Sequence, residues 1–285
     1  MATIPLDHLP TPSHPAWRSD LILRARSGAE VEEHPEHLVV RTRANPTFHW
    51  GNLIILRRAP RAGEVDRWRG AFRAAFPEAE HESYGFDVAP APDLMADLMV
   101  EWEAGGLELA ADTLLTATRM TPGEAPPGVE VRPLAGEDDW RRRLEADLLD
   151  AGDTPGGQLF LRRRWAAEKA LAEDALAAGT GAWWGAFADG DLLGSLGLFD
   201  VGGGEARYQQ VYTRPDARRR GVASALVRAA GARALDAPGV QRLLIVAETE
   251  GPAIGLYRRC GLSDTAPVWA AAAQPANQER NAAES

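Results

Sequence analysis

Hydrophobic and polar positions in the C-terminal half of the chain follow an alternating order of strands and helices. Strand-like apolar runs are separated by segments with the 3.6-residue spacing of amphipathic helices, and Asp189-Gly190 predicts the turn of a β-hairpin. The predicted elements are strand 129–134, helix 137–149, helix 158–179, hairpin 182–199, strand 206–213, helix 217–236, strand 242–248, helix 252–260 and an apolar run at 266–270. A meander followed by βαβ crossovers predicts an α/β fold, with a mixed sheet and helices on both of its faces.

The N-terminal half shows a fainter version of the same order. Its predicted elements are strand 48–56, helix 64–76, strand 81–88, helix 93–106 and a long strand or strand pair at 107–117. This β-α-β-α-β order matches the later part of the C-terminal half, element for element. We interpret it as a degenerate internal repeat of the same fold, and the alternative is a generic α/β accessory domain.

A segment rich in proline and glycine, RMTPGEAPPG at 119–128, separates the two halves. The chain of 285 residues has room for two domains, each with its own core. We therefore expect an N-terminal domain at 1–120, a linker at 121–128, a C-terminal domain at 129–270 and a disordered tail at 271–285.

Charge and cysteine content exclude several classes of function. The net charge of −10 argues against a nucleic-acid partner, because such binding requires many phosphates to be neutralised. The single cysteine, Cys260, excludes an internal disulfide and a cysteine metal cluster, and no metal site is expected. The N-terminus is unlike a signal peptide, and no apolar run is long enough to span a membrane. We expect a cytoplasmic protein, monomeric or homodimeric, with no membrane partner.

The stretch TRPDARRRGVASALV at 213–227 carries the most specific chemistry. A strand ends at Pro215 and Asp216, arginines follow, and Gly221 allows a turn with close backbone approach before a helix begins. Backbone N–H groups at a helix N-terminus bind anions, and neighbouring arginines add charge-assisted hydrogen bonds to phosphate. The stretch has neither a Gly-Lys-Ser/Thr nor a GxGxxG pattern, so a nucleotide triphosphatase and a Rossmann dinucleotide site are both unsupported.

Two motifs within 129–270 resemble the GNAT superfamily of N-acetyltransferases. Residues 218–223, RRRGVA, fit its Arg/Gln-x-x-Gly-x-Gly/Ala signature, and AIGLYRRCGL at 253–262 is similar to its closing A-x-x-LY-x-x-x-GF element, with Leu262 in place of Phe. The resemblance implies acetyl-CoA as the donor, with Arg218 as the signature arginine and Tyr257 as the general acid. It also implies pantetheine contacts from the main chain of Val211, Tyr212 and Thr213. The pyrophosphate would be held by Arg219, Arg220, Gly221, Val222, Ala223 and Ser224.

The general base is not evident from the sequence. Some members of the superfamily carry a catalytic glutamate where this chain has Gln209 and Gln210, which do not titrate. A water relay, or Glu205 or Glu248 acting at a distance, remains open as the base. Glu250 replaces an asparagine that relatives often have, and we expect it to cap helix 252–260.

The expected acceptor is a small-molecule amine or a protein amino group. Carboxylates at 145, 147, 150 and 153 could attract a cationic amine. In the N-terminal half the equivalent loop, at 57–68, has Pro60 and an acidic helix start, so we expect that half to bind no acetyl-CoA. The alternative to an enzyme is a catalytically weak acetyl-CoA-binding sensor or scaffold module.

Overall fold

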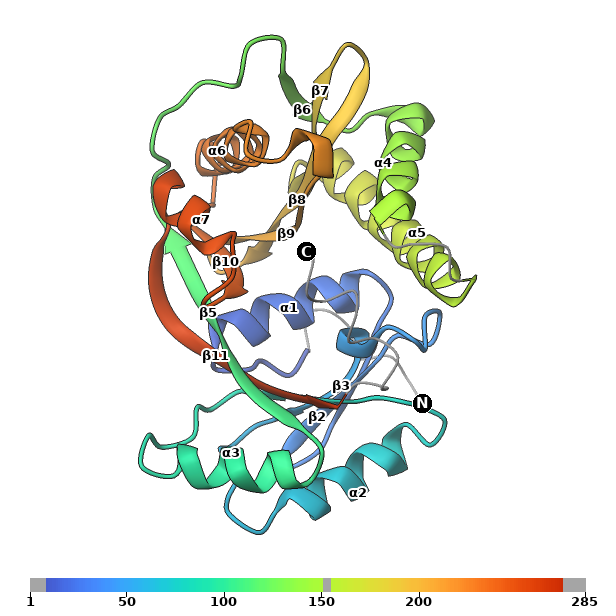
Figure 1. Cartoon of the computed structure of the whole chain (residues 1–285), viewed down its shortest axis with the longest axis vertical. Helices are drawn as coiled ribbons and strands as arrows, with labels where there is room; N and C mark the ends of the chain where they lie inside the picture. The colour runs from blue at the N-terminus through green and yellow to red at the C-terminus, as the bar shows by residue number, and fades with distance from the viewer. Residues whose placement is uncertain (1–8, 151–154, 274–285) are drawn as a thin grey trace. The chain divides into compact units, whose positions relative to one another are not determined.

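The computed structural model describes residues 9–150 and 155–273, and the chain divides into two compact units (Figure 1). The first unit contains the chain up to Asp112 together with the chain from Pro267 onward. Its elements are α1 (Pro15–Arg26), β1 (Glu30–Glu33), β2 (His37–Arg41), η2 (His49–Gly51), β3 (Asn52–Leu56), α2 (Val65–Ala75), β4 (Glu82–Phe86), α3 (Met95–Ala104) and the beginning of β5 (Glu108–Ala117). Within this unit α2 and α3 cover one face of the sheet and α1 covers the other.

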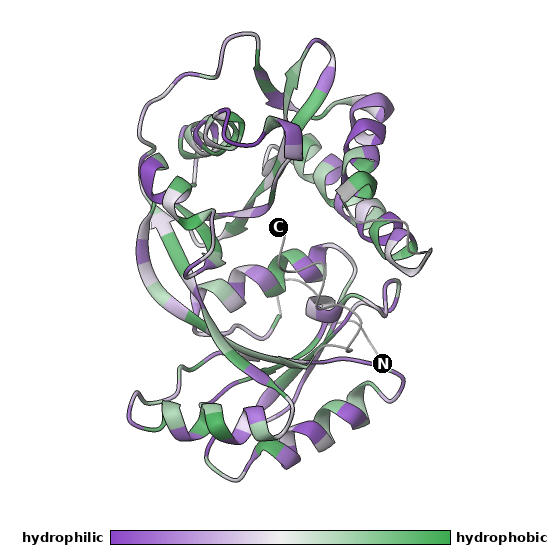
Figure 2. Ribbon diagram, in the orientation of Figure 1, coloured by the Kyte–Doolittle hydropathy of each residue, from purple (hydrophilic) through white to green (hydrophobic). Residues whose placement is uncertain are grey.

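The second unit spans Thr113–Ala266. Its elements after β5 are β6 (Glu130–Pro133), α4 (Gly136–Asp150), α5 (Pro155–Ala178), β7 (Gly181–Ala188), β8 (Asp191–Gly202), β9 (Glu205–Thr213), η3 (Pro215–Ala217), α6 (Val222–Leu235), β10 (Arg242–Glu248), α7 (Ile254–Cys260) and the beginning of β11 (Ser263–Ala273). Within this unit α6 and α7 lie on one face of the sheet, and α4 and α5 lie on the other (Figure 1). Figure 2 shows hydrophilic and hydrophobic residues interspersed along α2 and α4, as the sequence periodicity predicts.

Eleven strands form a mixed sheet in the order β1-β2-β3-β4-β11-β5-β10-β9-β8-β7-β6. The strands β5 and β11 each contribute residues to both units, so the units divide within strands rather than at the predicted linker. Residues 271–273, predicted to belong to a disordered tail, are part of β11. They pair with 82–84 of β4, and Ala271 is buried in the core of the first unit. The small alanine side chains suit this packed position, although their composition resembles that of a tail.

The two halves repeat one pattern of strand pairing, which confirms the fold predicted from the sequence. In the first half β1–β2 and β2–β3 are antiparallel and β3–β4 is parallel. In the second half β7–β8 and β8–β9 are antiparallel and β9–β10 is parallel. In both halves a helix connects the parallel pair, α2 in one and α6 in the other. Among the described residues, no helix is long and apolar enough to cross a membrane.

Candidate active site

A break in strand pairing at the centre of the second unit creates the first feature of the site. Ser195 of β8 pairs with Tyr212 of β9, and Gly197 pairs with Gln209. Two steps along β8 therefore correspond to three steps along β9. The extra residue forms a β-bulge, and Gln210 has a positive φ of 49°. Within the described residues, β9 and β10 pair only through 205–207 and 242–244. Beyond that point the two parallel strands diverge, so the main chain of β9 is available to an extended ligand on that side.

The segment after the bulge contains the residues predicted to contact pantetheine. Val211, Tyr212 and Thr213 are half-buried, and the last two pair with Ser195 and Gly194 of β8 on their other side. The Tyr212 hydroxyl donates to the carbonyl of Ala146 in α4 (3.3 Å). This anchoring holds the end of β9 in place while its β10 side stays open.

The loop from β9 to α6 presents backbone N–H groups at the start of a helix. Arg219 and Gly221 have positive φ values of 57° and 84°, and Gly221 is the N-cap of α6 with no side-chain hydrogen bond to the first turn. The predicted helix 217–236 therefore begins only at Val222, after a short 3₁₀ turn at 215–217. Left-handed residues next to a helix N-terminus form a concave set of N–H donors that favours anions.

The side chains around this loop leave a positive charge excess. Arg214 forms a two-pronged ion pair with Asp216 (2.6 and 3.0 Å), and this pair lowers the pKa of the Asp216 carboxyl. The Arg218 Nε donates to the Thr213 carbonyl (3.2 Å). Arg219 and Arg220 are exposed and have no ion-pair partner within residues 9–150 and 155–273. Two guanidinium groups are thus available to a phosphate group beside the α6 N-terminus.

Tyr257 projects from α7 into the core that it shares with Val222 and Leu226 of α6. Its side chain is 6% exposed, and burial, with a smaller contribution from Cys260, raises the pKa of the phenol to about 12. The phenol oxygen has no hydrogen-bond partner in the part of the chain that the structure describes. A neutral phenol with an uncommitted proton can donate it to a bound group.

The structure separates the candidates for the general base. Glu205 is buried at the start of β9, at the far end of the strand from the bulge, and its carboxylate pairs with Arg242. It is therefore unsuited to act as the base. Glu248 is exposed at the end of β10, the end at which β9 and β10 diverge. The Gln209 amide nitrogen is buried and has no hydrogen-bond partner within the described residues.

Two expectations about carboxylates need correction or qualification. Glu250 does not cap α7, because the N-cap is Ala253 and no side chain bonds to the first turn. In α4, Glu145 pairs with Arg141 (3.2 Å) and Asp147 with Arg143 (3.3 Å). These arginines compensate the charge that was expected to attract a cationic amine. The side chain of residue 150 and the whole of residue 153 lie outside the described residues.

The equivalent loop in the first unit is filled by the chain's own carboxylates. Glu101 of α3 accepts hydrogen bonds from the backbone N–H groups of Gly63 (2.8 Å) and Val65 (3.2 Å) at the start of α2. Glu64, the N-cap of α2, accepts from the N–H of Arg61 (2.9 Å) and from both terminal nitrogens of Arg58 (2.8 and 2.6 Å). The Arg58 hydrogen bonds lower the pKa of Glu64 to about 2, so this carboxylate is ionised at neutral pH. This geometry supports the expectation that the first half binds no acetyl-CoA.

Comparison with known proteins agrees with the geometry. Residues 148–262 match the sequence model of the Acetyltransferase (GNAT) family. No curated protein sequence matches the chain at a significant level.

Solved structures of this fold extend over most of the chain. A GCN5-related N-acetyltransferase from Kribbella flavida superposes with a TM-score of 0.64 at 16% identity, covering 93% of this chain and 98% of its own. A GCN5-related N-acetyltransferase from Sphaerobacter thermophilus gives a TM-score of 0.59 at 16% identity, with 88% and 84% covered. A tandem GNAT protein from the clavulanic acid biosynthesis pathway gives 0.54 at 14% identity, with 94% and 91% covered. Residues 148–262 therefore match the GNAT acetyltransferase family, and the chain has a tandem GNAT fold over most of its length.

Proposed function

We propose that this protein transfers the acetyl group of acetyl-CoA to an amine and that the second unit carries the reaction. One observation carries the proposal. The diverging strands β9 and β10 lie next to the N-terminus of α6, where Gly221 is the N-cap. Beside it, Arg219 and Arg220 lack ion-pair partners among the described residues. An extended amide chain ending in a pyrophosphate matches both features.

Each part of the site has a distinct task in this proposal. The main chain of 211–213 pairs with the amides of the pantetheine arm, as a further strand would. The N–H groups of 219–224 and the guanidinium groups of Arg219 and Arg220 bind the pyrophosphate. Arg218 is fixed on the Thr213 carbonyl, so it also joins the end of β9 to the loop.

The reaction is a direct transfer within a ternary complex. The amine nitrogen attacks the thioester carbon, an N–C bond forms, the C–S bond breaks and the electron pair leaves on sulfur. A protonated amine of pKa ~10 requires roughly 4 kcal/mol to become neutral at pH 7. Water or Glu248 accepts the amine proton, and Tyr257 supplies a proton to the leaving sulfur.

The acceptor class is a small-molecule amine or a protein amino group. The alternative function is a sensor that binds acetyl-CoA with little turnover. Its support is the pair Gln209 and Gln210, which places amides rather than a titratable group at the bulge.

Thiol release from acetyl-CoA across a panel of amines tests the proposal, with calorimetric titration of acetyl-CoA in parallel. We expect donor binding and an amine-dependent rate of thiol release. Donor binding with no turnover for any small amine or amine-bearing peptide would favour the sensor. Failure to bind acetyl-CoA at all would refute both functions.

A further inference from the structure

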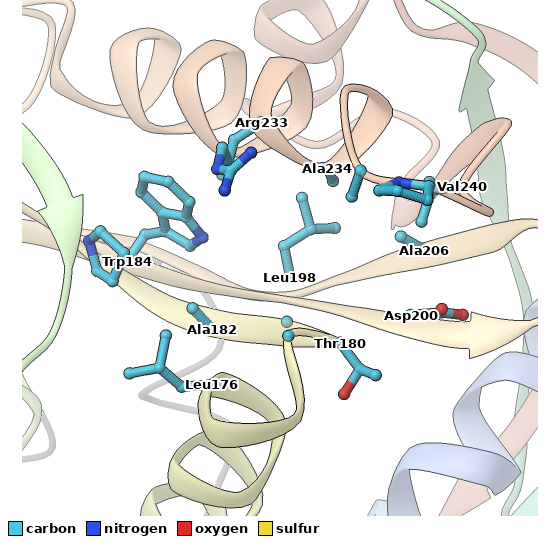
Figure 3. Close-up of a pocket in the computed structure, with 16 residues that line it drawn as sticks. Leu176, Thr180, Ala182, Trp184, Leu198, Asp200, Ala206, Arg233, Ala234 and Val240 are labelled. Atoms are coloured by element: carbon cyan, nitrogen blue, oxygen red, sulfur yellow. The ribbon is translucent and has the colours of Figure 1, made fainter.

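A cavity in the Thr113–Ala266 unit lies at the far end of α6 from the arginine-rich loop. Its volume is about 300 Å³, and it opens between the last turns of α6, the strands β7 and β8, and the end of α5 (Figure 3). Helix α6 has 14 residues, so its two ends are about 20 Å apart. The cavity is therefore separate from the proposed donor site, and the proposed function assigns it no role.

Apolar side chains make up most of the cavity wall. Leu198 and Ala206 form the floor on the sheet, and Trp184, Leu176 and Ala234 surround them. Leu176 remains 47% exposed at the rim, although residues of this type are commonly covered. Apolar cavities of this kind bind apolar ligands, and 300 Å³ is at the small end of the range for ligand sites.

The charged groups occupy opposite ends of the cavity. Figure 3 shows Arg233 and Trp184 at one end and Asp200 at the other. The Asp200 carboxylate accepts a hydrogen bond from the Gly202 N–H (2.7 Å), whereas Arg233 has no ion-pair partner within residues 9–150 and 155–273. The charge that lacks a partner in this cavity is therefore positive.

We propose that this cavity binds a small apolar molecule that carries a single carboxylate. The apolar body lies on Leu198 and Ala206, against the Trp184 indole, and the carboxylate pairs with the Arg233 guanidinium. A guanidinium pairs with a planar carboxylate through two parallel hydrogen bonds, which fixes the orientation of the ligand. The bound ligand covers the exposed part of Leu176.

Calorimetric titration with octanoate, octanol and octylammonium tests the proposal without use of acetyl-CoA. These probes share one apolar chain and differ in charge. We expect octanoate to bind at one site per chain, with a higher affinity than octylammonium, and to change tryptophan fluorescence in the wild type but not in Trp184→Phe.

Three variants locate the binding. Arg233→Gln should weaken octanoate about fivefold, as expected for loss of a partly exposed ion pair, and leave octanol within twofold. Arg163→Gln, on the exposed surface of α5, removes the same charge outside the cavity and should change nothing. Ala234→Phe fills the cavity and should abolish binding of all three probes, with a thermal melt as the check on folding. The proposal is overturned if octanoate fails to bind, binds equally well to a folded Ala234→Phe protein, or binds no better than octylammonium.

Discussion

Replacement of Tyr257 by phenylalanine separates a chemical role of this residue from a packing role. The side chain is 6% exposed, and its oxygen has no hydrogen-bond partner among the described residues. Removing the oxygen therefore leaves no buried donor or acceptor behind. The phenol oxygen keeps some contact with solvent, so its removal relieves only part of the about 1–3 kcal/mol that a fully buried hydroxyl without a partner costs. We expect the free energy of unfolding of Tyr257→Phe to be unchanged or to rise by about 1 kcal/mol.

Burial also sets the size and the pH dependence of the catalytic effect. The pKa of Tyr257 is raised to about 12, and that of an ordinary thiol is ~8.5, a difference of about 3.5. Complete transfer of the proton to a free thiolate would cost about 5 kcal/mol at 1.36 kcal/mol per pK unit. Proton transfer should therefore accompany C–S cleavage, and its loss should lower kcat at least tenfold. Because the phenol stays protonated below its raised pKa, the wild-type kcat should show no fall from this group between pH 8 and 10.

Tyr208→Phe is the matched control for Tyr257→Phe. The Tyr208 hydroxyl is buried and donates to the Val227 carbonyl of α6 (2.7 Å), so its loss removes a buried hydrogen bond. We expect Tyr208→Phe to lose roughly 1–2 kcal/mol of stability and to keep its kcat. Urea unfolding, thiol release and calorimetric titration of acetyl-CoA measure the three quantities for both variants. Tyr257→Phe with wild-type kcat and wild-type acetyl-CoA affinity would remove Tyr257 from the mechanism.

Further variants test the loop at 218–224, the filled loop at the start of α2, and His49. Gly221→Ala forces a side chain into a left-handed position (φ 84°), so it should lose about 1 kcal/mol of stability and weaken acetyl-CoA binding at least about fivefold. Gly239→Ala (φ 97°), outside the loop, should lose similar stability with unchanged affinity in the same titration. Glu101→Ala strips two backbone N–H groups of their acceptor and should cost about 1–2 kcal/mol in urea unfolding. Calorimetry of the wild type should give one acetyl-CoA per chain, and two per chain would contradict the filled loop. Burial lowers the pKa of His49 to about 4, so its contribution to the free energy of unfolding is complete above pH ~6.5 and falls as the pH drops. His49→Gln should therefore reduce the loss of stability between pH 7 and 5 by up to about 2 kcal/mol. Urea titrations at both pH values measure this difference.

The elements that the sequence predicts well are those whose signals are local. The hairpin at 182–199 is observed as β7 and β8, and its turn residues Asp189 and Gly190 both have positive φ, as a type I′ turn requires. Helix α1 and the hairpin of β1 and β2 were not predicted. In β1 only Val31 is apolar, so the strand has no visible alternation, and its pairing with β2 depends on the rest of the sheet.

The candidate site also has one part that the sequence predicts and another part that it does not. The requirement for glycine at 221 can be read from the sequence, because a turn into a helix favours a residue that tolerates positive φ. The bulge at Gln210 and the left-handed conformation of Arg219 carry no such signal, since both residues are unusual choices for positive φ. They arise from the pairing of β9 with β8 and from the divergence of β10. The cap expected at Glu250 failed because α7 begins later than its apolar pattern suggests.

The two halves differ most at the residue that begins the crossover helix. The N-cap of α2 is Glu64 and the N-cap of α6 is Gly221. This position therefore carries a carboxylate in the first half and no side chain in the second. At α2 an incoming pyrophosphate would have to displace the Glu101 carboxylate from two N–H groups and approach the ionised Glu64. At α6 no side chain caps the first turn. Since a helix N-terminus favours an anion by only ~1 kcal/mol at an exposed site, repulsion from two nearby carboxylates is enough to reverse that preference. The same fold thus leaves the N-terminus of α6 open, where we propose the donor site, and closes that of α2 with the Glu101 carboxylate.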